Sequence, residues 1–175
     1  MKTALVLGGA ACIHTDIEGA LMLFTPDLII AINDIGMIYK NVDHWVTKHP
    51  AKFPGWIKGR EVNKLPPVPT LWTSDHRKIP GGYVIHRTES NDGGSGLLAV
   101  RVAVHKLGCT KVVLAGVPLQ RQDAHYFSVG IPWKEAGIYR RGWVQAKKLH
   151  PFIKSMSGWT KEILGAPTVE WLASE

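Results

Sequence analysis

The sequence predicts a three-layer α/β fold of the Rossmann-like type, in which a mostly parallel sheet carries helices on both faces. Three observations predict it. Short apolar segments, typical of strands buried on both faces, occur at residues 3–7, 28–32 and 111–115. Segments with apolar residues at helical spacing lie between strands of this kind, and turns rich in glycine or proline separate the two.

Length and composition limit the class of protein. The chain has 175 residues, which suits one domain, and 45% hydrophobic with 20% charged residues excludes a disordered or collagen-like chain. We expect a single domain over residues 1–175, with residues 133–175 packed on it as a basic, aromatic-rich C-terminal extension. No apolar run reaches the ~20 residues of a membrane-spanning helix, so we expect no membrane partner.

The cysteines and the N-terminal segment bear on location. Only Cys12 and Cys109 occur, which excludes a disulfide framework and favours a reducing compartment. The segment before Cys12 imitates a lipoprotein signal, but its continuous apolar run covers only residues 4–7, short of the ~7–15 residues required. Such signals usually carry leucine where Gly9 stands. We therefore expect a first strand here, and a cytoplasmic protein.

A helix follows the first strand and its glycine turn. Thr15 and Glu18 have the spacing of a capping box, which predicts the start of this helix. Pro26 ends it, before the strand at residues 28–32. Its apolar stripe consists of Ile13, Ile17, Leu21 and Phe24.

The middle of the chain predicts three further strands. One covers residues 44–49 and precedes a short helix around Trp56. Two others, at residues 71–74 and 83–86, lie on either side of a turn at residues 80–82. A loop rich in glycine and serine follows at residues 89–96.

The clearest unit is a helix followed by a buried strand. The helix begins at Ser95, Gly108 ends it, and the strand covers residues 111–115. This order is half of a βαβ unit, so the strand is expected to be parallel to its neighbours. The apolar stripe of the helix consists of Leu97, Val100, Val104 and Leu107.

The last third is less regular. Residues 120–132 form a polar loop, residues 134–148 are moderately helical, and residues 152–156 predict a short strand. Two short helical segments follow, the second after Pro167.

Ligands of doubly wound sheets bind beyond the carboxyl ends of the strands, which selects candidate residues. Gly8, Gly9 and Ala10 follow the first strand, where backbone amides and a helix start favour an anion; the alternative is a plain turn. Neither a G-x-G-x-x-G fingerprint nor a Walker loop is present. Asn33 and Asp34 follow the second strand, where they suit ribose or base contacts or, alternatively, an Asx turn.

A second anion site is predicted at Gly94, Ser95 and Gly96, where glycines let a ligand approach the backbone; alternatively, Ser95 only caps the helix. Gly116 follows the strand at residues 111–115 and belongs to the same strand-end set. His125 lies in the next loop, and its imidazole suits a general acid or base, or is simply solvated.

Metal and nucleic-acid binding are alternatives for other residues. His44 and His49 fall on opposite faces of the expected strand, so we predict no metal site. Basic residues from Lys134 to Lys161 alternate with aromatic ones, which suits nucleic-acid binding or a solvated face with aromatics packed inward. The aromatic residues in this stretch are Tyr139, Trp143 and Trp159, with Trp133 just before it.

The run SGLLAVRVAVHKLG at residues 95–108, continued by KVVLAGV at residues 111–117, supports a family resemblance. It resembles a unit shared by CMP-sialic-acid-dependent bacterial sialyltransferases and hydroxymethylpterin diphosphokinase-like proteins. The resemblance implies that Gly8, Gly9 and Asn33 bind a nucleotide, and that His125, which Tyr126 follows, is catalytic. With stretches such as NDIG at residues 33–36, DHWVT at residues 43–47 and SMSGW at residues 155–159, the whole chain also resembles short Rossmann-like proteins of phages and prophages, which implies such an origin.

The chain departs from the sialyltransferase pattern in three ways. Its first turn reads Gly-Gly-Ala-Ala instead of Gly-Asn-Gly-Pro-Ser, Pro118 replaces an acidic residue, and the chain is shorter. We therefore expect a nucleotide- or nucleotide-sugar-binding protein, with glycosyl or phosphoryl transfer as its reaction if it is an enzyme. Alternatives are a non-catalytic nucleic-acid- or partner-binding protein and a binder that sequesters a nucleotide-derived signal. No cofactor beyond the nucleotide is implied, and self-association is left open.

Overall fold

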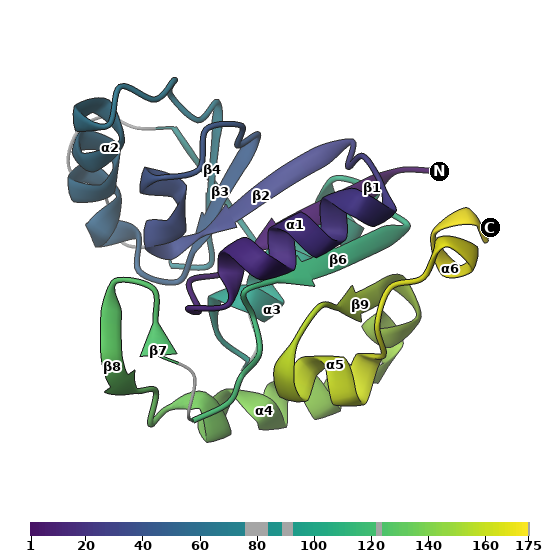
Figure 1. The fold of residues 1–175 in the computed structure, drawn as a ribbon. Helices are drawn as coiled ribbons and strands as arrows, with labels where there is room; N and C mark the ends of the chain where they lie inside the picture. The colour runs from purple at the N-terminus through teal and green to yellow at the C-terminus, as the bar shows by residue number, and fades with distance from the viewer. Residues whose placement is uncertain (76–83, 89–92, 122–123, 175) are drawn as a thin grey trace.

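The computed structural model describes residues 1–75, 84–88, 93–121 and 124–174. It has a seven-stranded parallel sheet with helices on both faces, which confirms the predicted fold class (Figure 1). The strand order is β5-β4-β3-β2-β1-β6-β9, and a two-stranded antiparallel hairpin, β7-β8, stands apart. The strands are β1 (Thr3–Leu7), β2 (Leu28–Ile32), β3 (His44–Thr47), β4 (Thr70–Thr73), β5 (Ile85–Arg87), β6 (Lys111–Ala115), β7 (Ala124–His125), β8 (Ser128–Pro132) and β9 (Ile153–Ser155).

The helices cover the two faces of the sheet because successive strand residues point to opposite sides. Leu5 packs with α1 and α2, whereas Val6 packs with α3, and both are fully buried. Burial on both faces explains why the strands are continuous apolar runs. The helices are α1 (Ile13–Leu23), α2 (Phe53–Val62), α3 (Gly94–Arg101), α4 (Ala136–Gln145), α5 (Gly158–Leu164) and α6 (Val169–Ala173), with 3₁₀ segments η1 (Asn33–Met37), η2 (Pro50–Lys52) and η4 (Lys147–Phe152) and a π-helical turn η3 (Val102–Lys106).

The strand order reverses at β1. From β1 the chain adds β2, β3, β4 and β5 outward on one side, then returns to place β6 on the other side of β1. Val6 of β1 is therefore paired with Ile30 of β2 and with Leu114 of β6. The carboxyl edge between β1 and β6 is the topological switch point, where doubly wound sheets bind ligands.

The structure differs from two local predictions. Thr15 caps no helix, because α1 begins earlier, at Ile13, and has no side-chain cap bond. Leu21 of the predicted apolar stripe is 46% exposed, and Ala20 is buried instead. Of the two strands predicted near residue 80, β4 and β5 pair in parallel, with Ile85 beside Leu71. The turn predicted at residues 80–82 lies outside the described residues.

The C-terminal third contributes to the domain itself. Residues 124–132, predicted as loop, contain the β7-β8 hairpin, in which His125 is paired with Ser128. β9 extends the main sheet beside β6, with Ile153 opposite Val112. Trp143 of α4 is fully buried in the same core cluster as α3. Residues 133–175 therefore complete both the sheet and its core.

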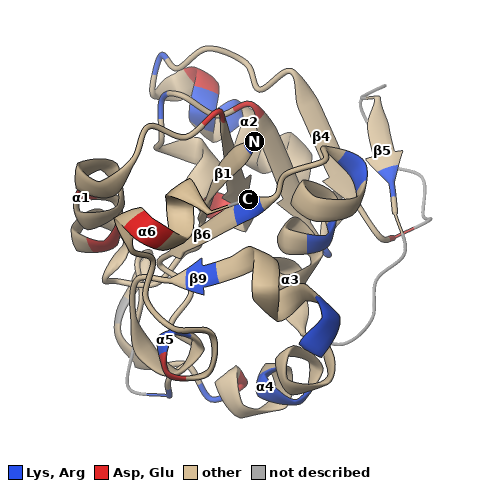
Figure 2. Cartoon of the chain, turned by 90° about the vertical axis from the view of Figure 1, so that its right-hand side faces the viewer, with Lys and Arg blue, Asp and Glu red and all other residues tan. Residues whose placement is uncertain are grey.

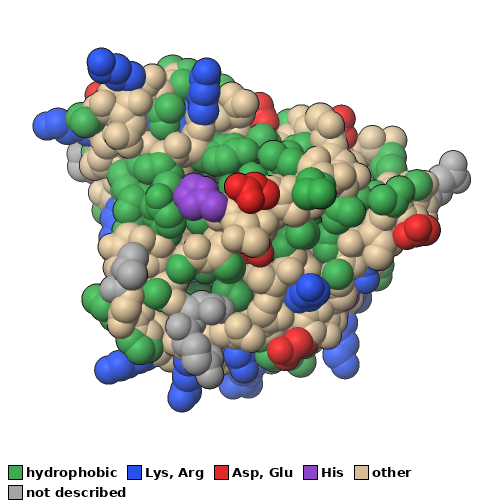
Figure 3. All heavy atoms as spheres, viewed as in Figure 1, with side chains coloured by type: hydrophobic (Ala, Val, Ile, Leu, Met, Phe, Trp, Pro, Cys, Tyr) green, Lys and Arg blue, Asp and Glu red, His purple; other side chains and the backbone are tan. Residues whose placement is uncertain are grey.

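Charge is spread over the surface. Lys and Arg residues occur on several elements, α3, α4 and β9 among them (Figure 2). On the face seen in Figure 3, hydrophobic side chains gather in the upper half and basic ones lie mostly at the margins. Within the described residues, no helix is long and apolar enough to cross a membrane.

Candidate functional site

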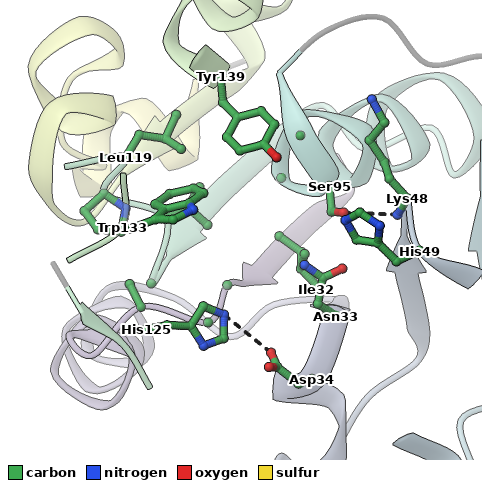
Figure 4. Close-up of a pocket in the computed structure, with 18 of the residues that line it drawn as sticks. Ile32, Asn33, Asp34, Lys48, His49, Ser95, Leu119, His125, Trp133 and Tyr139 are labelled. Carbon is green, nitrogen blue, oxygen red and sulfur yellow. Dashed lines mark hydrogen bonds and ion pairs between the residues drawn. The ribbon is translucent and has the colours of Figure 1, made fainter. Parts of the chain in front are cut away.

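A cleft of about 570 Å³ opens at the carboxyl edge of the sheet, beside the switch point (Figure 4). It is lined by the segments that follow β1, β2, β3 and β6, by the start of α3, and by residues of β7 and α4. Every site residue predicted from the sequence lies in its wall, although their role in binding stays a prediction. These residues are Gly8, Gly9, Ala10, Asn33, Asp34, Gly94, Ser95, Gly96, Gly116 and His125.

The β7-β8 hairpin brings His125 to Asp34. Backbone hydrogen bonds from Tyr126 N to Gly9 O (2.7 Å) and from Ala11 N to Ala124 O (2.9 Å) hold β7 against the turn after β1. His125 Nε2 then lies 3.6 Å from Asp34 Oδ1 (Figure 4). A Cβ atom at Gly9 would lie only 2.6 Å from His125 Nε2, so the ring reaches this position because residue 9 is glycine.

The Asp34 carboxyl group is unusual for its burial. Its Oδ1 atom is inaccessible to solvent and has no hydrogen-bond partner among the described residues. Burial raises the pKa of Asp34, while electrostatic interactions with His125 and Lys52 and backbone hydrogen bonds oppose that rise. A carboxyl group of this kind beside an imidazole is a pairing suited to proton transfer.

Asn33 is fixed at the start of η1. Its backbone is left-handed, with φ of 54°, a conformation that Asn tolerates better than most residues. Thr47 Oγ1 donates to Asn33 Oδ1 at 2.7 Å, and Trp45 Nε1 donates to its carbonyl oxygen. The side-chain NH₂ group of Asn33 is left facing the cleft (Figure 4).

In the turn before α1, three backbone amides already have partners within the protein. Gly8 N donates to Ala115 O at 2.8 Å, and Ala10 N donates to Gly116 O at 3.1 Å. The hairpin takes the amide of Ala11. This turn forms the floor of the cleft, and its binding of an anion stays a prediction.

The start of α3 is open to the cleft. The first amides of a helix have no acceptor within it, and those of Gly94, Ser95 and Gly96 have no backbone acceptor elsewhere in the described residues. Ser95 does not cap the helix: the N-cap residue is Gly93, with φ of 124°. The Ser95 hydroxyl instead accepts the amide of Lys48 at 3.1 Å, which ties the end of β3 to the start of α3.

Sequence reasoning missed the basic residues of the cleft. Lys48, His49 and Lys52 line it, but the strand was expected to continue through residue 49. β3 ends at Thr47, whose hydroxyl accepts the amide of His49 at 2.9 Å and turns the chain. The Thr-Lys-His sequence before Pro50 was the available signal for a strand end.

Aromatic side chains of the C-terminal third were also missed as cleft residues. Trp133 and Tyr139 line the cleft, with ring centroids 5.6 Å apart and planes at 31°. Trp143 is buried behind them and donates Nε1 to Gly93 O at 3.1 Å. The guanidinium group of Arg140 lies over the ring of Trp159, with its central carbon 4.9 Å from the ring centroid. All four aromatics pack against the core, and Trp133 and Tyr139 also line the cleft, so nucleic-acid binding by this stretch stays a prediction.

Comparisons with known proteins add no relative. No family model, curated protein or solved structure matches the chain.

Proposed function

We propose that this chain binds a nucleotide or nucleotide-linked donor in the cleft and catalyses transfer of a group from it. The observation that carries the proposal is the pair of Asp34 and His125, 3.6 Å apart, in a cleft at the switch point of the sheet. Switch-point clefts are where doubly wound folds bind ligands, and a carboxyl–imidazole pair supplies proton transfer.

Positive potential on one side of the cleft supports an anionic ligand. This side of the cleft carries the start of α3, whose first amides have no backbone acceptor in the described part of the chain. It also carries Lys48, His49 and Lys52. Lys48 is half-buried, so its charge is less screened than that of an exposed lysine. A phosphate here would gain charge-assisted hydrogen bonds both before and during bond cleavage.

In the proposed reaction, His125 accepts the proton of the acceptor hydroxyl as the hydroxyl oxygen attacks the donor. The bond from the transferred group to the donor phosphate breaks, and the leaving phosphate keeps the electron pair. Asp34, beside Nε2 of His125, orients the imidazole and stabilises the imidazolium that forms. Donors at the start of α3 stabilise the charge on the phosphate, as preorganised hydrogen bonds do in other transferases.

The proposal is tested by calorimetric titration with nucleoside mono- and diphosphates and CMP-sugars. We expect binding in the micromolar to millimolar range, weakened in Asn33→Ala, which removes the amide facing the cleft. Lack of binding by all of these ligands at millimolar concentration would refute it. His125→Gln then separates the two parts of the proposal: the variant should bind the donor as the wild type does and lose turnover. Binding without turnover by the wild type would indicate a sequestering protein instead.

A further inference from the structure

The cleft has two chemically different sides. Trp133 and Tyr139 lie on one, and Lys48 and His49 lie on the other, next to Ser95 (Figure 4). We propose that Trp133 and Tyr139 form a subsite, the aromatic shelf, that stacks against the planar base of the ligand. The anionic end of the ligand then lies toward Lys48. This inference rests on the proposed function and adds the orientation of the ligand and the residues that recognise its ring.

The shelf is held from behind by the core. Tyr139 lies against the start of α3, where a Cβ atom at Gly94 would be 3.1 Å from its ring. Arg140, the next residue of α4, donates Nε to Leu119 O at 2.9 Å and stacks on Trp159. These contacts fix α4 before any ligand arrives. A fixed aromatic surface loses little entropy on binding a ring.

The geometry of the two rings suits a planar partner. Both rings are half-buried and line the cleft, and their planes are inclined by only 31°, so a planar base can lie against either ring at a similar tilt. Base stacking on such a surface is strong and tolerates different bases. We therefore expect modest selectivity among bases, with purines favoured because they cover more of the shelf.

Trp56 is the competing aromatic residue in the cleft wall, and its surroundings suit stacking less well. Trp45 lies parallel to its ring, with centroids 6.2 Å apart and planes at 20°, and Phe53 meets it edge-on at 6.0 Å. Lys52 is placed 6.0 Å from its centroid. The ring of Trp56 is thus largely engaged within the protein.

The test compares AMP, CMP and ribose 5-phosphate by titration calorimetry and tryptophan fluorescence at low salt. We expect AMP and CMP to bind the wild type at least about tenfold more tightly than ribose 5-phosphate, because only they carry a base. Trp133→Leu and Tyr139→Leu should each weaken AMP binding about 5- to 100-fold and leave ribose 5-phosphate binding unchanged. Trp171→Phe, on α6 away from the cleft, is the control and should leave both affinities unchanged.

Each outcome decides between the proposals. Equal affinities of the wild type for AMP and ribose 5-phosphate would overturn the aromatic shelf without requiring any variant to fold. Wild-type AMP affinity in both shelf variants, together with weak binding in Lys48→Ala, would overturn the shelf and keep the proposed function. No binding of any of the three ligands to the wild type would overturn the proposed function, and the shelf with it.

Discussion

The α1 and α3 helices both begin at the carboxyl edge of the sheet, yet the backbone amides before them meet different partners. Before α1, the amides of Gly8 and Ala10 are bonded to carbonyls that follow or end β6, and the hairpin takes the amide of Ala11. At the start of α3, the amides of Gly94 and Ser95, two residues that line the cleft, have no backbone acceptor in the described part of the chain. The two helix starts therefore differ in how many of their amides are bonded within the protein.

The turn before α1 joins segments that are far apart in the sequence. Gly8 and Gly116 approach so closely that a side chain at either would overlap the carbonyl of the other. Asp16 of α1 accepts the Gly116 amide at 2.8 Å and the Ser157 hydroxyl at 2.5 Å. These contacts therefore connect β1, β6 and α5, and the following predictions compare this turn with the start of α3.

The largest effect is expected from Gly8→Ala. Its Cβ atom would lie 2.3 Å from the carbonyl oxygen of Gly116, and backbone cannot move aside as a flexible side chain can. We expect a loss of about 3 kcal/mol or more in the free energy of unfolding, measured by urea denaturation. At the start of α3, Gly96→Ala meets only side chains at 3.3 Å and should cost about 1 kcal/mol.

The control for both is Gly55→Ala in α2, where a Cβ atom meets nothing within 4 Å. Its stability should stay the same or rise by up to about 1 kcal/mol, through helix propensity. If Gly8→Ala were as stable as Gly96→Ala, the turn before α1 would not be packed more tightly than the start of α3.

Asp16→Ala should have the next largest effect. It leaves the buried amide of Gly116 without an acceptor and removes the bond from Ser157, so we expect a loss of about 2–3 kcal/mol. Glu18, two residues along the same helix, is exposed, and Glu18→Ala should change stability by less than about 0.5 kcal/mol. Chemical denaturation of both variants measures the difference. Equal losses would mean that the two bonds of Asp16 contribute no more to stability than an exposed side chain does.

Burial explains which parts of this fold the sequence predicts. Residues 3–7, 28–32 and 111–115 are buried on both faces, so their apolar runs identify strands without any partner being known. The predicted start of α1 at a Thr15 cap was wrong, because α1 begins at Ile13 without a side-chain cap. Asp16, inside the helix, instead accepts the amide of Gly116, a hundred residues away, which no local pattern reveals.

The same distinction holds for the candidate site: residues at strand ends were predicted, whereas contacts that depend on tertiary packing were not. Strand-end residues such as Asn33 and Ser95 were found because a parallel sheet brings its carboxyl ends together. The approach of His125 to Asp34 depends on a hairpin that a polar loop sequence does not reveal. The sequence left open whether Trp133 and Tyr139 bind a ligand or pack inward, because tertiary packing decides the direction of such side chains.

Lys48→Ala tests the cleft wall beside the start of α3. Losing this half-buried ammonium group should weaken the binding of nucleoside diphosphates about tenfold, or about 1.4 kcal/mol. Lys58→Ala, an exposed lysine on α2, is the matched control and should bind as the wild type does. The difference should shrink as salt concentration rises in the titration. Equal weakening by both variants would point to general charge, not to a site beside α3.

Asp34→Asn is expected to have the smallest effect, with the opposite sign to that of Asp16→Ala. Burial raises the folded-state pKa of Asp34, so ionising this carboxyl costs folding free energy. The cost is absent below the unfolded pKa of an aspartate, grows as pH rises through that value, and is complete above the folded pKa. Asparagine avoids it, so the variant should be about 1 kcal/mol more stable at pH 7.

That gain should disappear as pH is lowered toward 3, where Asp34 is protonated in both the folded and the unfolded states. Urea denaturation across this pH range measures it, with the exposed Glu61→Gln as a control that stays near the wild type. Lower stability of Asp34→Asn at pH 7 would mean that His125 fully compensates the buried carboxylate. Higher stability combined with lost turnover would identify a strained group retained for chemistry, in contrast to Asp16, whose carboxylate is satisfied and holds the fold together.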